Sequence, residues 1–187
     1  EIVTDEIATF TETGLKLKSG KDLPADLVVT ATGLDLLFLG GMKVSVDGKP
    51  IDMPKQLTYK GMMYEGVPNL VSVFGYTNAS WTLKCDLTCE YVCRLLNYMD
   101  KRGLRQCTPR NTDPSVTAEP WLSFSSGYVQ RALAQLPKQG SKAPWRLYQN
   151  YIRDLITLRP GQTLKNATLA ASTIVPKPNS SVWISRA

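Results

Sequence analysis

The chain has 187 residues, a net charge of +6 and an apolar fraction of 43%, values that suit a globular protein of one large or two small domains. No run approaches the roughly 20 consecutive apolar residues of a membrane-spanning helix, so we expect no membrane insertion. The sequence contains no histidine, which excludes Ser-His-Asp and Cys-His catalysis within this chain. It opens without a secretory signal, as though cut from a longer protein.

Residues 1–32 predict a β-meander, because segments rich in β-branched residues alternate with turns at ETG and SGK. Its last segment, residues 27–32, is an apolar run that ends at Gly33 and predicts a strand covered on both faces. Ala31 and Gly33 carry almost no side chain, so a bulky ligand could approach the backbone there. An ordinary glycine turn is the alternative.

Residues 34–68 look irregular apart from a possible hairpin at VSVDGKPID. A second apolar strand is predicted over residues 70–74, followed by the loop GYTNAS at residues 75–80. Helical spacing of apolar residues predicts a helix from about Trp81 to Lys101, with Gly103 as its stop signal. Side chains of this loop, from Thr77, Asn78 or Ser80, could cap the helix.

Three cysteines, Cys85, Cys89 and Cys93, recur every four residues and therefore share one face of the predicted helix. A zinc site would call for Cys-x-x-Cys pairs or histidine ligands, so we predict no metal site. We expect small thiols that fill a buried helix face. Reduced cysteines also favour a cytoplasmic location.

A proline-punctuated connector leads from the helix to two shorter predicted helices. The first lies in SSGYVQRALAQLPKQG, with its end marked by Pro137 and Gly140. The second lies in APWRLYQNYIRDLITLR, with Trp145, Tyr148, Ile152 and Leu155 on one side. Residues 161–187 lose any periodic pattern and predict an irregular tail.

The joint between residues 75–80 and the following helix favours a ligand. The loop offers backbone amides and small polar groups, and the helix points its unsatisfied N–H donors and partial positive charge at the same place. An electron-rich oxygen is stabilised there, which suits a flavin, whose reduced ring carries negative charge along one edge. Taken alone, the joint is equally compatible with a plain helix cap that binds nothing.

Together, DLVVTATG and the stretch from NLVSVFGYTNAS to the helix resemble flavoprotein monooxygenases of the Baeyer–Villiger and flavin-containing monooxygenase group. The chain is similar above all to the bacterial subgroup with the ethionamide-activating monooxygenase, over roughly residues 1–158. The resemblance implies an α/β fold: the C-terminal portion of a two-dinucleotide-binding-domain, Rossmann-like FAD/NADPH flavoprotein, with a β-meander and C-terminal helices.

The resemblance also implies four parts. Residues 1–33 would end the NADPH domain and return to the FAD domain, and residues 34–105 would carry the flavin-facing loop and helix. Residues 106–160 would form a connector and helices, before the tail at 161–187. Cofactor contacts are implied for Ala31, Thr32, Gly33, Gly75, Tyr76, Thr77, Asn78, Ser80, Thr82 and Leu83.

Neither Gly-x-Gly-x-x-Gly loop of the family is present, so FAD and NADPH would both need an upstream segment. We expect no catalytic residue here and no activity of the chain alone. In a complete enzyme, one oxygen atom from O2 would enter a carbonyl compound or be added to sulfur or nitrogen of a small-molecule substrate. Candidates for the substrate channel are Trp81, Trp121, Trp145 and Tyr148, although such aromatic residues are more often core.

Two alternatives stay open. A non-catalytic interaction or scaffold domain, derived from a flavoprotein, would also lack phosphate-binding loops. A nucleic-acid binder ranks third, because the basic residues are interleaved with acids and read as a solvated surface. An unpaired sheet edge beside residues 27–32 could also cause self-association.

Overall fold

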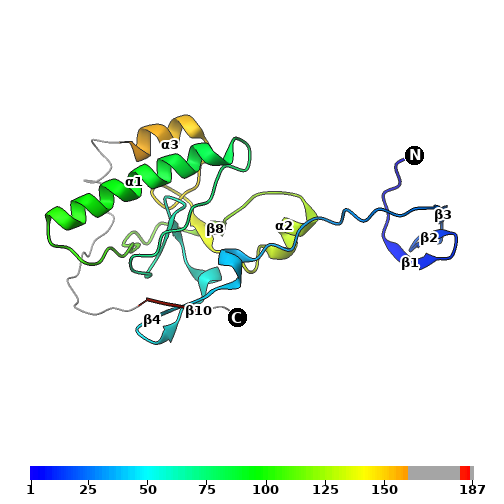
Figure 1. Ribbon diagram of the computed structural model, residues 1–187, viewed down its shortest axis with the longest axis horizontal. Coiled ribbons are helices and arrows are strands. Elements are labelled where there is room, and N and C mark those ends of the chain that lie inside the picture. Colours follow the sequence, from blue (N-terminus) through cyan, green and yellow to red (C-terminus); the bar gives the residue numbers. More distant parts are fainter. Residues whose placement is uncertain (160–181, 186–187) are drawn as a thin grey trace. The chain divides into compact units, whose positions relative to one another are not determined.

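The computed structural model describes residues 1–159 and 182–185, the last four by their backbone alone. The chain forms two compact units, Glu1–Leu34 and Asp35–Ala187 (Figure 1). We describe each unit by itself. The mixture of small sheets and a few helices makes this an α/β protein in the broad sense.

The first unit is an antiparallel meander of three strands, β1 (Ile7–Thr11), β2 (Gly14–Leu17) and β3 (Asp22–Pro24). Gly14 begins β2 at a φ of +149°, and a Cβ there would lie 2.0 Å from the carbonyl oxygen of Leu23. Only glycine at this position allows β2 and β3 to approach so closely. The predicted meander is confirmed for these three strands, but its first segment, residues 1–5, forms no strand.

The predicted fourth strand, residues 27–32, is wrong for this chain. These residues adopt no regular structure, and the side chains of Leu27 and Val29 are each 81% exposed. A strand of this composition is stable only between paired neighbours. Among the described residues no strand pairs with it.

In the second unit, β4 (Lys43–Val46) and β5 (Lys49–Pro50) form the predicted hairpin. Asp47 and Gly48 both have positive φ, 51° and 76°, as the two-residue turns that match strand twist require. A third strand, β10 (Val182–Ser185), pairs antiparallel with β4. The prediction of an irregular tail is therefore wrong for residues 182–185. Their β-branched and aromatic residues are typical of a strand.

Two further strand pairs are short. β6 (Thr58–Tyr59) pairs with β7 (Met63–Tyr64), and β8 (Ala118–Pro120) pairs with β9 (Lys138–Gly140). Single 3-10 turns lie at Phe38–Gly41 and Met53–Lys55. The predicted strand over residues 70–74 is reduced to one bridge between Val71 and Met63.

The longest helix, α1 (Trp81–Lys101), has the predicted bounds. Its end is a Schellman motif: Leu104 N–H donates to the Met99 carbonyl, Gly103 N–H donates to the Asp100 carbonyl, and Gly103 has a φ of 63°. The expected stop signal at Gly103 is thus confirmed.

Two shorter helices follow, α2 (Gly127–Ala132) and α3 (Tyr151–Leu158). The prediction that a helix includes Trp145 and Tyr148 is wrong, because α3 begins only after Asn150. The Asn150 side chain accepts a hydrogen bond from Arg153 N–H at 3.0 Å and so caps the helix there. The predicted apolar side also fails at Ile152, which is 67% exposed.

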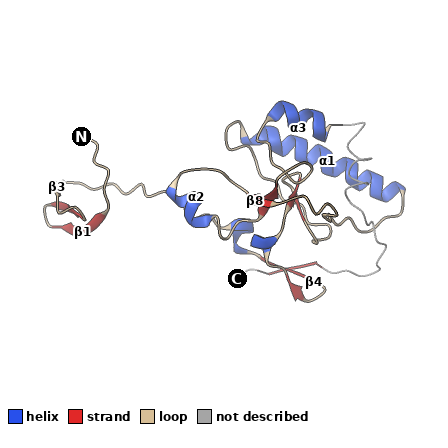
Figure 2. Cartoon of the chain, turned by 180° about the vertical axis from the view of Figure 1, so that it is seen from behind, coloured by secondary structure: helices blue, strands red, loops and turns tan. Residues whose placement is uncertain are grey.

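The helix α3 lies alongside α1 in both views (Figures 1 and 2), and the main core packs against α1. It unites side chains from the segment around β6 and β7, from α1 and from the C-terminal part: Leu57, Tyr59, Met62, Met63, Leu87, Tyr91, Leu95, Met99, Cys107, Trp145 and Leu158. A smaller cluster surrounds Trp121 and α2.

All four cysteines are free thiols, but only Cys107 is buried. The expectation of a buried cysteine face is wrong in this chain, because Cys89 and Cys93 are exposed and Cys85 is partly so. The buried face of α1 instead carries Leu87, Tyr91, Leu95 and Met99. No helix of the described part is long and apolar enough to cross a membrane, and the same residues contain no cluster suited to a metal.

Candidate functional site

The loop at residues 75–80 begins with a close contact between backbone and indole. The ring of Trp81 lies so near Gly75 that a Cβ there would be 2.2 Å from its Cδ2 atom. Phe74 meets the same indole edge-on, with ring centroids 4.8 Å apart. Gly75 is therefore required by the fold of the loop itself, whatever the loop binds.

Gln149 holds Thr77 and Asn78 of the loop in place. Its Oε1 accepts hydrogen bonds from the Thr77 N–H at 3.1 Å and the Thr77 hydroxyl at 3.2 Å. Its backbone carbonyl accepts from Asn78 Nδ2 at 3.0 Å. Gln149 reaches this position with a φ of 50°, a conformation uncommon outside glycine. The sequence contained no signal for this contact, which joins residues 72 positions apart.

Tyr76 points into the protein, away from the loop surface. Its hydroxyl donates to Asp154 Oδ2 at 2.7 Å, and the Lys84 ammonium lies 2.8 Å from the same oxygen. The three residues are only 3%, 8% and 4% exposed, respectively. Burial, and then the hydrogen bond to the Asp154 carboxylate, raise the pKa of Tyr76, so the phenol stays neutral. Loop, α1 and α3 are thus joined by one buried carboxylate.

A second lysine lies close to this network. Lys60 donates from Nζ to the Thr157 carbonyl at 3.2 Å, and its ammonium is 5.5 Å from the ring centroid of Tyr91. Burial, and then the charge of Lys84, lower the pKa of Lys60 to about 8, while the charge of Asp154 opposes the shift. Two cations therefore face one carboxylate near the amino half of α1.

The amino end of α1 is open. Ser80 takes the cap position, but its side chain accepts no hydrogen bond from a backbone N–H of the helix; its hydroxyl instead lies 2.9 Å from the hydroxyl of Thr82. The predicted side-chain cap is thus wrong for Ser80, and the Thr77 and Asn78 side chains bond to Gln149. Asn78, Ser80 and Thr82 are exposed and Leu83 is partly exposed. N–H donors of the first turn lack the side-chain cap that a helix usually has.

The other predicted cofactor residues, Ala31, Thr32 and Gly33, belong to the first unit. They are exposed and lie outside any strand, with Gly33 at a φ of 89°. Residues 75–83 belong to the second unit, whereas Ala31, Thr32 and Gly33 belong to the first.

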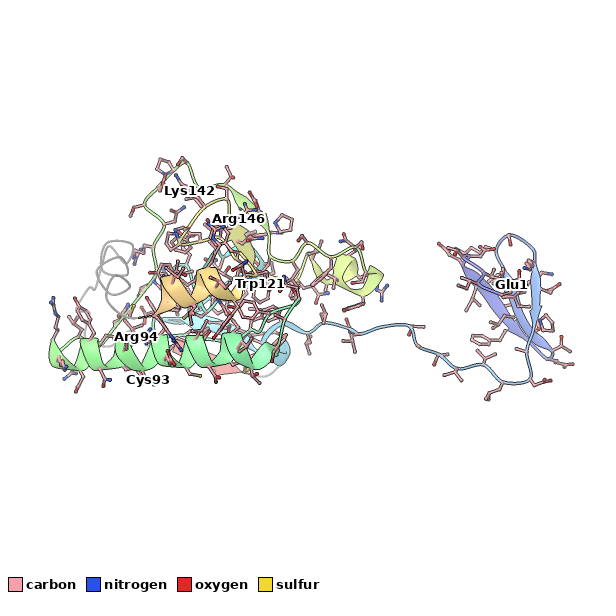
Figure 3. All side chains as sticks on the ribbon, turned by 90° about the horizontal axis from the view of Figure 1, so that it is seen from above. Glu1, Cys93, Arg94, Trp121, Lys142 and Arg146 are labelled. Atoms are coloured by element: carbon pink, nitrogen blue, oxygen red, sulfur yellow. The ribbon has the colours of Figure 1, made fainter. Side chains whose placement is uncertain are left out.

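The channel candidates divide into two kinds. Trp121 and Trp145 are each 3% exposed and belong to the core clusters, whereas Trp81 is 49% exposed beside the loop. Tyr148 is partly buried and stacks on the Arg153 guanidinium, 3.7 Å from its ring centroid. Figure 3 shows Trp121 within the body of the second unit.

Comparison with known proteins adds the identity of related chains. The FAD-containing monooxygenase EthA of Mycobacterium tuberculosis (strain H37Rv) is 51% identical over 162 residues, covering 87% of this chain and 33% of the relative. EthA of Mycolicibacterium smegmatis is 52% identical over 159 residues, covering 85% and 32%. The probable FAD-binding monooxygenase AlmA of Acinetobacter baylyi is 48% identical over 159 residues, covering 84% and 32%.

No family model matches the chain, and no solved structure gives a significant match. The chain spans about a third of the length of the curated relatives that it matches. Identity near 50% over most of the chain leaves no doubt about common descent. This chain is therefore homologous to about one third of the length of the bacterial FAD-containing monooxygenases of the EthA, AlmA and MymA type.

Proposed function

We propose that this chain is the C-terminal, flavin-facing third of an FAD- and NADPH-dependent monooxygenase. The observation that carries the proposal is the identity of about 50% to FAD-containing monooxygenases over most of the chain. The amino end of α1 supports it, because Ser80 forms no side-chain cap and Asn78, Ser80 and Thr82 are exposed at the joint for which the resemblance implies flavin contacts.

The residues of this surface fit the pyrimidine edge of a flavin, which presents carbonyl oxygens and gains negative charge on reduction. N–H donors at residues 81–83 and the dipole of α1 would stabilise that charge. Asn78, Ser80 and Thr82 would add polar side chains, and Gly75 to Thr77 would supply backbone contact. Ala31, Thr32 and Gly33 would form a second contact near the junction of the dinucleotide domains. When bound, FAD supplies the oxygen-activating chemistry.

The buried side chains have a positioning role in this proposal. Tyr76, Lys84 and Asp154 fix the loop to α1 and α3, so that the amino end of the helix keeps its direction when a ligand binds. Gln149 does the same for Thr77 and Asn78. We infer that this part of the chain orients the flavin and excludes water from one side of it.

The complete enzyme would act in the cytoplasm on a small molecule, with O2 as co-substrate. It would place one oxygen atom in a carbonyl compound or on sulfur or nitrogen, using NADPH as reductant. The fold implied for it is the two-dinucleotide-domain, Rossmann-like architecture, with this chain completing the FAD domain. Alone, the chain lacks the phosphate-binding loops and would be inactive.

One observation favours the alternative of a non-catalytic scaffold domain. The Thr77 amide and hydroxyl are already hydrogen-bonded to Gln149, so part of the loop is satisfied without a ligand. A scaffold of this kind would fold and bind partners but would not retain flavin in any longer protein.

A chimera tests the proposal. Residues 1–159 of this chain would replace the homologous third of the Mycolicibacterium smegmatis relative, and the purified protein would be assayed for bound FAD and NADPH oxidation. We expect the chimera to contain bound FAD and to oxidise NADPH, and this chain alone to do neither. A folded chimera without FAD would contradict the proposal and favour the scaffold.

Ser80→Asp within the chimera tests the amino end of α1 directly. The new carboxylate should cap the helix and stabilise it by about 0.3–1 kcal/mol, while repelling an electron-rich flavin edge. We therefore expect higher stability and FAD affinity weakened by about fivefold or more. Asn97→Asp adds the same charge at an exposed position in the second half of α1 and is the matched control. Unchanged FAD affinity in Ser80→Asp would mean that this end does not face the flavin.

A further inference from the structure

The helix α1 is apolar on two sides, which a helix at the surface of a complete protein rarely is. One side forms the core. The second side, which we call the outer face, consists of five residues at helical spacing: Trp81, Cys85, Cys89, Cys93 and Leu96. Trp81 and Leu96 are 49% and 57% exposed, and Cys89 and Cys93 are also exposed. Figure 3 shows Cys93 on the side of α1 turned away from Arg94 and α3.

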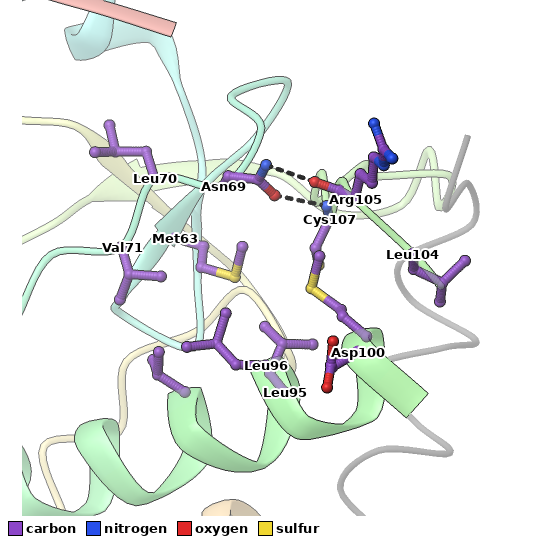
Figure 4. A pocket seen from close by; sticks show the side chains of 12 residues that line it. Met63, Asn69, Leu70, Val71, Leu95, Leu96, Asp100, Leu104, Arg105 and Cys107 are labelled. Atoms are coloured by element: carbon purple, nitrogen blue, oxygen red, sulfur yellow. Dashed lines mark hydrogen bonds between the residues drawn. The ribbon is translucent and has the colours of Figure 1, made fainter. Parts of the chain in front are cut away.

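The outer face continues into an apolar groove at the carboxyl half of the helix (Figure 4). Leu95, Leu96 and Met99 form one wall of this groove, and Val71 and Leu104 line it from two other segments. Its volume is about 690 Å³. Asn69, Asp100 and Arg105 lie among its lining residues, so the groove combines an apolar floor with polar groups, as interfaces do.

Solvent does not explain this composition. A helix face that is solvated in the finished protein carries charged residues, as α1 does at Asp86 and Glu90. Five apolar or thiol residues on one face of the helix, together with an adjoining groove, form the kind of patch that marks an interaction site. Small thiols at three successive turns also allow a partner to approach the helix closely.

The length of the relatives indicates the partner. This chain matches only 33% of EthA, so about two thirds of such a protein lies outside the matched region. We propose that the outer face of α1 and its groove are the surface on which that remaining part packs, through an apolar face of its own. The inference rests on the proposed function, because it takes this chain to be one third of a longer monooxygenase. It makes α1 a central helix, covered by this chain on one side and by the remaining part on the other.

Thiol reactivity tests the proposal at the residues concerned. The chain alone and the chimera with the Mycolicibacterium smegmatis relative would be treated with iodoacetamide, and the labelling rate of each cysteine would be followed by peptide mass analysis. In the chimera, Cys89 and Cys93 should react at least about tenfold more slowly than in the chain alone, because packing restricts access to them. Cys107, which is 7% exposed, should react slowly in both and reports that the domain is folded.

The outcomes separate this proposal from the proposed function. A chimera that retains FAD but labels Cys89 and Cys93 as fast as the chain alone would overturn the docking surface and leave the function standing. A chimera in which Cys89 and Cys93 are protected but no FAD is retained would support the docking surface and overturn the proposed function. Protection in the chain alone that grows with its concentration would identify a second copy as the occupant and overturn the proposed one.

A second measurement does not depend on the folding of a chimera. This chain and the unmatched part of the same relative would be co-expressed as separate polypeptides and purified through a tag on one of them. We expect co-purification, its loss in Leu96→Glu and its retention in Asn97→Glu, which places the same charge on the neighbouring exposed residue. Failure to co-purify, or equal behaviour of the two variants, would overturn the proposal.

Discussion

Asp154 connects three segments that lie far apart in the sequence, because its carboxylate accepts from Tyr76 of the loop and pairs with Lys84 of α1. A buried ion pair contributes little net stability compared with apolar residues, but removing one partner leaves the other charged and desolvated. We therefore expect Asp154→Ala to lower the free energy of unfolding by roughly 3–5 kcal/mol, as measured by urea denaturation.

The double variant Lys84→Met, Asp154→Leu is the control for this prediction. It removes both charges and fills similar volume, so it should recover most of the lost stability. Tyr76→Phe should cost less, about 1.5–3 kcal/mol, because it removes a single hydrogen bond to a charged group. If the double variant were as unstable as Asp154→Ala, packing around Asp154 would matter more than its charge.

Lys60 should make stability depend on pH. Its pKa is lowered to about 8, mainly by burial, against an ordinary value of 10.5. Between these values the unfolded chain holds a proton that the folded chain has released, so the wild-type free energy of unfolding gains a contribution that rises with pH. Lys60→Met should be more stable than wild type at pH 7, by about 1–3 kcal/mol, and this advantage should shrink towards pH 10.5.

Urea denaturation of both proteins at several pH values measures this difference. The rings of Tyr59 and Tyr91, 5.9 and 5.5 Å from the Lys60 ammonium, favour the charged form and work against the shift. A stability difference that does not vary between pH 7 and pH 10.5 would show that these rings, together with the Thr157 carbonyl, outweigh burial.

At the scale of elements, local signals predicted what local interactions determine. The bounds of α1 follow from helical spacing and from Gly103, and the β4–β5 hairpin follows from Asp47–Gly48. Both depend on residues within a few positions of one another, so a single sequence contains the necessary information.

Elements that need distant partners were predicted poorly. The apolar residues 27–32 have the composition of a strand, but a strand needs neighbours, and the described residues offer it none. The start of α3 is set by the Asn150 cap. The apolar residues before Asn150 in the same run led to the wrong prediction of an earlier start. In the site, the joint at residues 75–83 was predictable, whereas Gln149 and Asp154 were not, because each acts across 70 or more residues.

The end of α1 provides a prediction for a local element. Gly103 has a φ of 63°, and a side chain there would be strained by about 1–2 kcal/mol. Gly103→Ala should lower the free energy of unfolding by that amount in urea denaturation. Gly103→Asn should cost less, because asparagine tolerates the left-handed conformation better. Equal losses in the two variants would indicate a steric clash rather than backbone strain, although a Cβ there meets nothing within 4 Å.

For the whole molecule, the two units differ in how they are built. Asp35–Ala187 has three core clusters among its described residues, whereas the meander of Glu1–Leu34 buries Leu17 and exposes most of its other side chains. Apolar residues 27–29 lie at the end of that smaller unit. A segment of this composition is covered in a finished protein, so its exposure agrees with a chain that completes a larger fold.

Limited proteolysis with thermolysin, which cuts before exposed apolar residues, tests this view. Among the described residues, we expect the earliest cut at Leu27, Val29 or Leu34, which are 81%, 81% and 64% exposed and outside any strand or helix. In the chimera the same segment should resist cleavage, because strand pairing would cover it. Mass analysis of the fragments identifies the site. An earliest cut inside α1 or the β4–β5 hairpin would show that the second unit opens first, and cleavage at residues 27–34 at the same rate in a FAD-retaining chimera would mean that no strand forms there.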